Sequence, residues 1–144
     1  MLLNVSYNNK EVYRKIDTAV GKPFTIAERV KRGGIGVGRL VITEASVQIN
    51  NLLILDNNRN VCSVEMRPKG ILVGFRSILE SYVLVIPYYK LSLYKGRAEE
   101  YSIHMDTYFI KIQAKAKDKY THRFMAKILA EKASQQPAHP SDPI

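Results

Sequence analysis

Residues 69–113 constrain the fold more than any other part of the chain, because short apolar segments alternate there with turn residues. Residues 71–75 show the two-residue alternation of a strand with one buried face, residues 82–86 form an almost unbroken apolar run, and residues 101–112 read as two strands joined by a tight corner. Strands separated by turns about every 8 to 12 residues are typical of an antiparallel sandwich or small barrel. Because proline is confined to strand starts, edges and bulges, the sheet should bend or change partner at Pro87.

A second group of strands is predicted upstream of this stretch. Residues 39–49 alternate between apolar and polar side chains, residues 52–55 form a short apolar run, and residues 56–60 are a strong turn signal. Residues 62–66 alternate again, with Cys62 on the apolar side. The pattern predicts a hairpin across the turn, and it favours a buried structural thiol at Cys62 over a nucleophile.

The period of the pattern changes after residue 118. Residues 119–133 carry apolar side chains at helical spacing, and Asp118 suits the N-cap position. Such a helix needs an apolar surface to lie on, which the open end of the sheet would supply. Residues 134–144 are proline-rich and are predicted to form a disordered tail. The predicted apolar stripe of the helix consists of Tyr120, Phe124, Met125, Ile128 and Leu129.

The first 37 residues read as an added segment. Residues 2–7 and 11–16 are rich in strand-forming side chains and flank two asparagines, which predicts a hairpin. Residues 25–32 predict a short helix, because Thr25 and Glu28 have the spacing of a capping box and a glycine follows.

The composition indicates one globular domain. The chain has 144 residues, 46% hydrophobic side chains and a formal net charge of +9, which favours weak association with phosphate-rich partners. Its single cysteine excludes an intramolecular disulfide, and neither a signal peptide nor an apolar run long enough to span a membrane is present. We therefore expect a cytoplasmic protein, with peripheral association with a membrane as an option.

Residues 33–38 contain four glycines, which raises the question of a phosphate-binding loop. A nucleotide-binding loop follows a strand and opens a helix, whereas here a helical pattern precedes the glycines and a strand pattern follows. A hinge or tight entry into the first strand of the barrel explains the glycines better, and an enzyme that uses this loop is the remote alternative. His104, His122 and His139 lack metal-ligand spacing and read as surface histidines, so neither a catalytic group nor a cofactor is predicted.

The order of elements, a curved array of about seven antiparallel strands followed by an amphipathic helix, resembles the pleckstrin-homology (PH)-like superfamily, including its GRAM and bacterial members. The sequence of residues 38–43, Gly-Arg-Leu-Val-Ile-Thr, is similar to the first-strand entry of many of those members, and Ile86-Pro87 with the following residues is similar to their Ile-Pro strand start. The resemblance covers residues 38–133 and divides the chain into an extension (1–37), a PH-like barrel (38–133) and a tail (134–144).

The resemblance implies a non-enzymatic binding or scaffolding module, sometimes one that binds acidic lipids and often one that binds protein. Lipid-binding members resemble one another in a lysine followed by a Lys/Arg-x-Arg group. Here Lys69 and Arg76 could supply the ends of that pattern, but Gly74 stands where the middle basic residue should be. A lipid headgroup site of that type is therefore doubtful.

Basic and aromatic side chains also gather over residues 88–97. Alternation would place Tyr88, Lys90 and Tyr94 on one side of a strand, with Lys95 and Arg97 close by. Such a surface suits either nucleic acid or an ordinary edge strand protected by lysine. The sequence thus favours a binding module whose partner is most often protein, with acidic lipid or a nucleic-acid-binding barrel as alternatives. No small-molecule substrate is inferred, and the oligomeric state stays open.

Overall fold

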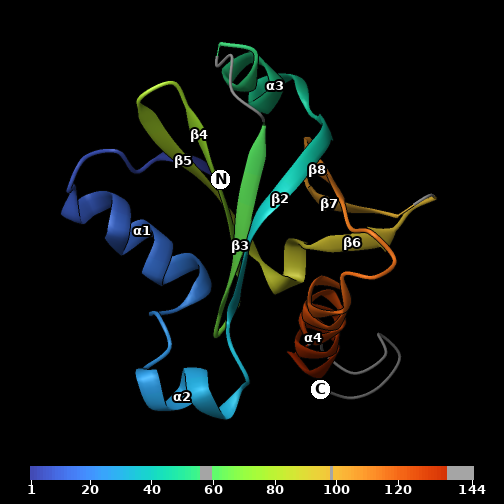
Figure 1. Cartoon of the computed structure of the whole chain (residues 1–144). Helices are drawn as coiled ribbons and strands as arrows, with labels where there is room; N and C mark the ends of the chain where they lie inside the picture. The colour runs from blue at the N-terminus through green and yellow to red at the C-terminus, as the bar shows by residue number, and fades with distance from the viewer. Residues whose placement is uncertain (56–59, 98, 136–144) are drawn as a thin grey trace, which may run out of the picture.

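The computed structural model describes residues 1–55, 60–97 and 99–135 (Figure 1). The strands are β1 (Leu2–Asn4), β2 (Gly36–Ala45), β3 (Val61–Arg67), β4 (Gly70–Ser77), β5 (Glu80–Pro87), β6 (Ser92–Lys95), β7 (Glu100–Met105) and β8 (Tyr108–Gln113). The helices are α1 (Lys10–Val20), α2 (Ile26–Lys31), α3 (Val47–Leu53) and α4 (Lys119–Gln135), with a 3-10 turn, η1 (Tyr88–Lys90), between β5 and β6.

All eight strands belong to one antiparallel sheet in the order β1-β5-β4-β3-β2-β8-β7-β6. The long strand β2 belongs to both halves, because its first part pairs with β3 and its last part, from Ile42 to Ala45, pairs with β8. The register shifts in both pairings, and Arg39, which lies inside the shift between Val37 and Leu40, has a φ of 55°. These irregularities bend β2, so the two halves of the sheet turn their apolar faces toward each other.

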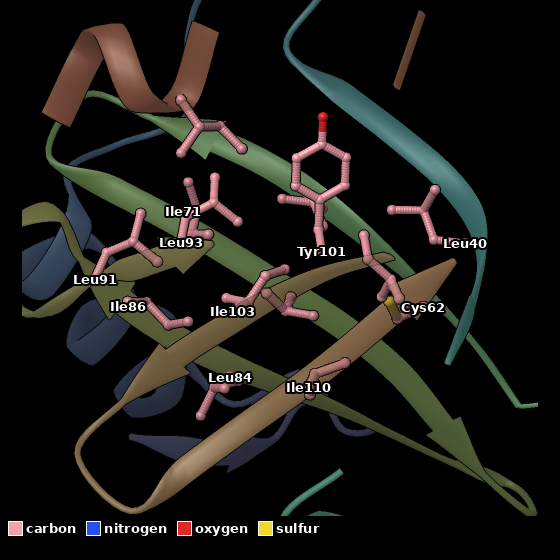
Figure 2. Close-up of a cluster of buried hydrophobic side chains, with 14 of the residues drawn as sticks. Leu40, Cys62, Ile71, Leu84, Ile86, Leu91, Leu93, Tyr101, Ile103 and Ile110 are labelled. Atoms are coloured by element: carbon pink, nitrogen blue, oxygen red, sulfur yellow. The ribbon is translucent and has the colours of Figure 1, made fainter. Parts of the chain in front are cut away.

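The main core fills the space between the two halves (Figure 2). Cys62, Ile71 and Leu84 point into it from β3, β4 and β5, and Ile103 and Ile110 point into it from β7 and β8. Helix α4 adds a buried stripe to the same core. The expected class, a mainly β protein with antiparallel strands and a C-terminal helix, is confirmed. The stripe residues of α4 in the core are Phe124, Met125 and Ile128.

Several local predictions for residues 69–113 are confirmed. The chain leaves the first half of the sheet at Pro87, makes the η1 turn and enters the second half as β6. β7 and β8 pair across a tight corner in which Asp106 has a φ of 54°.

The predicted N-cap of the C-terminal helix is confirmed as well. The Asp118 carboxylate accepts hydrogen bonds from the backbone N–H and the hydroxyl of Thr121, as an N-cap residue does.

The predicted N-terminal hairpin is wrong. Residues 2–4 form a strand, but it pairs with β5, and residues 10–20 form helix α1. Asn9, expected in a turn, caps that helix by accepting a hydrogen bond from the Glu11 N–H. The deciding pattern is the helical spacing of Ile16 and Val20, which pack on the outer face of β4 and β5. The remaining buried members of this outer cluster are Leu72, Val83 and Val85.

The predicted hairpin across residues 56–60 is wrong as well. Residues 47–53 form helix α3, in which Ile49 and Leu53, four residues apart, are buried. β3 instead pairs with β2 and β4. Alternation at Val47 and Ile49 is compatible with either a strand or a helix, and the burial of Ile49 and Leu53 selects the helix. Residues 56–59 of the expected turn, and residues 136–144 of the expected disordered tail, lie outside the described residues.

Helix α2 and the glycine segment agree with the sequence interpretation. Thr25 Oγ1 accepts from the Glu28 N–H, and Glu28 Oε1 accepts from the Thr25 N–H, so the capping box is complete. Gly33 and Gly34 have φ values of 73° and 98°, and β2 begins at Gly36. The glycines thus make the tight entry into the first long strand that the sequence predicts.

Cys62 is expected to resist thiol reagents in the folded protein. Its side chain is 3% exposed, and burial raises the pKa of the thiol from 9.0 to about 12, so the reactive thiolate is scarce at neutral pH. Because Cys62 is the only thiol in the chain, reaction with Ellman's reagent reports on it alone. We expect no release of the chromophore from the native protein within minutes and one equivalent in denaturant. Equal rates in the two conditions would show that the core around Cys62 is open.

Candidate functional site

The structure separates the two residues of the sequence-predicted lipid signature. Lys69 is exposed in the turn before β4, and Arg76 is exposed near the other end of the same strand. The two residues are seven positions apart along an extended strand, which corresponds to about 23 Å at about 3.3 Å per residue. Gly74 faces the same side of the sheet as Arg76, and a Cβ built on it would lie 3.3 Å from Ser63 Oγ. Lys69 and Arg76 therefore do not share a headgroup site.

The structure also divides the predicted surface over residues 88–97. Tyr88 and Lys90 lie in η1 and not on a strand, so their expected alignment with Tyr94 is wrong. The Tyr88 side chain is 2% exposed, and burial raises the pKa of its hydroxyl. Lys90 is half-exposed and forms an ion pair with Asp106 at 3.6 Å. The turn arises because Pro87 ends β5 and the Leu91 N–H then donates to the Tyr88 carbonyl oxygen.

Tyr94, Lys95 and Arg97 stay together at the end of β6. The Tyr94 ring is 59% exposed and meets the His104 ring edge-on, with 5.6 Å between the ring centres. Lys95 and Arg97 are exposed. These three are the predicted site residues that lie near further basic side chains, which belong to α4.

Those basic side chains surround a hollow of about 620 Å³, here called the basic hollow. It lies between the β6–β7 hairpin, the segment after β8 and the first two turns of α4. Within the described ranges, no carboxylate lies within ion-pair distance of Lys95, Lys119 or Arg123. Arg123 Nε donates to the carbonyl oxygen of Lys119, so the three cations line the hollow without a carboxylate partner. Its lining consists of Lys95, Glu99, Tyr101, Ala114, Ala116, Lys119, His122 and Arg123.

His122 is not the free surface histidine that the sequence suggested. Its Nδ1 lies 2.7 Å from the Tyr101 hydroxyl, and its Nε2 lies 2.9 Å from the Lys115 carbonyl oxygen. Because a carbonyl only accepts, Nε2 carries a proton and donates it to Lys115, and Nδ1 of the neutral ring accepts from Tyr101. Burial also raises the pKa of the Tyr101 hydroxyl, which keeps it a donor. These hydrogen bonds hold the side chains of Tyr101 and His122 in place, and both side chains line the basic hollow.

A second surface was missed in the sequence. Ile54, Leu55, Ile78 and Leu79 are 65%, 58%, 56% and 83% exposed. Ile54 and Leu55 follow the end of α3, and Ile78 and Leu79 form the β4–β5 turn. A hydrogen bond joins the two elements, because the Ser77 hydroxyl donates to the Leu52 carbonyl oxygen. Both elements lie at the same end of the molecule in Figure 1. We call this group of four aliphatic residues the apolar tip.

Ile78 is unusual in its backbone as well as its exposure. Its φ is 57°, in the left-handed region that a β-branched residue rarely adopts. Glycine or asparagine would fit this turn at lower cost. An exposed and strained isoleucine next to an 83% exposed leucine is an arrangement that folding alone does not explain.

The apolar tip borders a second hollow, of about 880 Å³, on the outer face of the sheet. Ile78 forms part of its rim, and Arg39 and Arg76 line it together with the polar side chains of Asn60 and Ser63. In the part of the chain that the structure describes, neither guanidinium has a carboxylate within ion-pair distance. The hollow's Glu65 is bound to Arg67 at 2.6 Å. We call this site the arginine hollow.

The glycine segment offers few free groups for a phosphate. The Gly33 and Gly34 N–H groups donate to the carbonyl oxygens of Val30 and Arg29. The ammonium group of Lys127 donates to the carbonyl oxygens of residues 32, 33 and 34 at 2.6, 3.3 and 3.2 Å. This segment therefore serves to anchor α4 next to the start of β2.

Two further features bear on the chemistry. Over residues 1–55, 60–97 and 99–135, no group of three histidine, cysteine or acidic side chains is arranged to hold a metal ion. No helix in those ranges is long and apolar enough to cross a membrane.

Comparison with protein-family models, with curated proteins and with solved structures found no match.

Proposed function

We propose that the protein is a non-enzymatic binding module of PH-like architecture that attaches peripherally to an acidic membrane surface through its apolar tip. The observation that carries the proposal is the gathering of four large, mostly exposed aliphatic side chains beside Arg39 and Arg76, which have no carboxylate partner within residues 1–55, 60–97 and 99–135. Exposed apolar patches rimmed by polar groups are typical of interaction sites.

Topology supports the PH-like part of the proposal. The strand that opens the long meander, β2, pairs with the strand that closes it, β8, and the C-terminal helix packs across one end of the resulting core. This arrangement is compatible with the curved antiparallel array and closing helix that the sequence resemblance implies. The added elements β1 and α1 pack on β5 and on the outer face of β4 and β5, away from α4.

The shape of the apolar tip favours a lipid surface over a protein pocket. Its residues sit on a hairpin turn and a helix end, which protrude and can enter a headgroup layer. Burying one leucine or isoleucine side chain yields about 1.5 to 3 kcal/mol. A basic side chain close to an acidic membrane adds about 1 kcal/mol, and Arg39 and Arg76 are placed to add it.

Sedimentation with vesicles tests this proposal. We expect the protein to bind vesicles that contain about one third phosphatidylserine, and the double variant Ile78→Asn with Leu79→Ser to bind at least tenfold more weakly, since about 1.4 kcal/mol corresponds to a factor of ten. Asparagine tolerates the φ of 57° at position 78, so the loss would not come from unfolding.

The matched control removes two aliphatic side chains elsewhere. Ile26 and Val30 on α2 are 79% and 76% exposed, so the double variant Ile26→Ser with Val30→Ser changes as much apolar surface away from the tip. It should bind like the wild type. Arg39→Gln with Arg76→Gln should weaken binding most at low salt. Unchanged sedimentation of the tip variant, or equal binding to uncharged vesicles, would refute the proposal.

A further inference from the structure

Strand β6 is an open edge of the sheet. It stands last in the strand order and pairs only with β7. Among the described residues, no backbone hydrogen bond reaches Ser92–Lys95 from any other element. An edge strand of this kind presents N–H and C=O groups that an extended chain can pair with.

Helix α4 lies beside that edge (Figure 1). At one end the Lys132 ammonium group donates to the carbonyl oxygen of Tyr88, just before β6, at 2.9 Å. At the other end Lys95, which closes β6, shares the basic hollow with Lys119 of α4. The first turn of α4 thus lies near Lys95 and its last turns lie near Tyr88.

The side of α4 that contacts Tyr101 and Tyr88 is partly apolar and uncovered. His122 contacts Tyr101 on β7, and Lys132 contacts Tyr88, so Leu129, seven residues after the first and three before the second, lies on the same helix face. Leu129 is 43% exposed, and the small Ala126 beside it is also exposed. A chain paired with β6 would find an apolar contact there.

The charge of the neighbourhood selects the partner. Lys95, Lys119 and Arg123 face the basic hollow without a carboxylate partner in the described ranges, and Arg97 is exposed in the adjoining turn. We infer that an extended acidic segment of a partner protein binds here, adding a strand to the edge of β6 and placing its carboxylates in the basic hollow.

A second copy of this chain is a poorer occupant. A second copy brings no opposite charge to this edge, because each copy presents another Lys95 and carries the same net charge of +9. An acidic strand instead combines main-chain pairing with opposite charge, the two components that give affinity and specificity in strand addition.

The test uses a fluorescein-labelled peptide of nine residues that alternates glutamate and valine, read by anisotropy against the full chain. We expect saturable binding that the double variant Lys95→Glu with Arg123→Glu weakens more than tenfold. The variant Lys10→Glu with Lys15→Glu changes the net charge equally on exposed positions of α1, and it should bind like the wild type.

Three results would overturn the inference. The first is equal affinity of the wild type and the Lys95→Glu, Arg123→Glu variant, provided circular dichroism shows both folded. The second is full binding by a peptide of the same charge that carries N-methyl groups along both edges, because strand pairing needs free N–H groups on the edge that meets β6. The third is displacement of the peptide by single-stranded DNA at lower concentration, which would assign the basic hollow to nucleic acid. The vesicle-binding tip variant should retain peptide binding.

Discussion

The variant Gly70→Ala is expected to lower the free energy of unfolding by about 3 kcal/mol or more, because the methyl group has no room. A Cβ at this position would overlap the carbonyl oxygen of Ile86 on the paired strand. It would also lie 2.6 Å from Cγ1 of Val20 and 2.9 Å from Cα of Pro87. Two of these three neighbours are backbone atoms, so the clash could be relieved only by moving β5.

Urea denaturation followed by circular dichroism measures this effect. Gly38→Ala is the matched control, because a Cβ there meets no atom within 4 Å. We expect the midpoint of the Gly38 variant to stay near that of the wild type, whereas the Gly70 variant should unfold at much lower urea or fail to accumulate as folded protein. Coinciding midpoints of the two variants would mean that α1 is not held against β4 and β5 as described.

The variant Phe124→Ala should lower the free energy of unfolding by about 3 to 5 kcal/mol, because it loses buried apolar surface and leaves a cavity. Phe124 is 1% exposed and packs from α4 into the main core. Leu129→Ala removes a side chain of the same helix that is 43% exposed, and its cost should be markedly smaller.

The difference between these two variants tests how α4 is oriented. Thermal or urea unfolding monitored by tyrosine fluorescence gives both values under the same conditions. If Leu129→Ala were the more damaging substitution, the buried face of α4 would differ from the one described, and the inference drawn for β6 and α4 would lose one of its supports.

The sequence predicted correctly those elements whose local pattern is compatible with only one type of secondary structure. The alternation in β4, the apolar run of β5 and the proline that ends it all follow from residues 71–87 alone. The stripe of α4 repeats over several turns, and only its edges, Tyr120 and Leu129, proved to be 46% and 43% exposed.

The wrong predictions come from short segments whose pattern is ambiguous. Residues 10–20 contain strand-forming side chains, and what makes them a helix is the apolar outer face of β4 and β5, which Ile16 and Val20 cover. That face is a product of sheet pairing between segments far apart in the chain. Local propensity therefore could not reveal it.

The candidate surfaces were predictable to different degrees. Lys95 and Arg97 were identified from the sequence, but Lys119 and Arg123 join them only because α4 begins beside the β6–β7 hairpin. Ile78 and Leu79 lie between the two apolar segments 71–75 and 82–86, and no pattern in the sequence marks them as a surface. Their exposure depends on the turn conformation at Ile78, and the nearness of Ile54 and Leu55 depends on helix α3, which the sequence interpretation lacked.

The double pairing of β2 has a consequence for the order of folding. The partners Ile42 and Ile112 are 70 positions apart in the chain, whereas β3 and β4 each pair with the strand that follows them. Closing so long a loop costs more entropy than forming a hairpin. The seam between β2 and β8 should therefore form after the β3–β4 and β4–β5 hairpins and open before them, and amide hydrogens along it should exchange before those of β4.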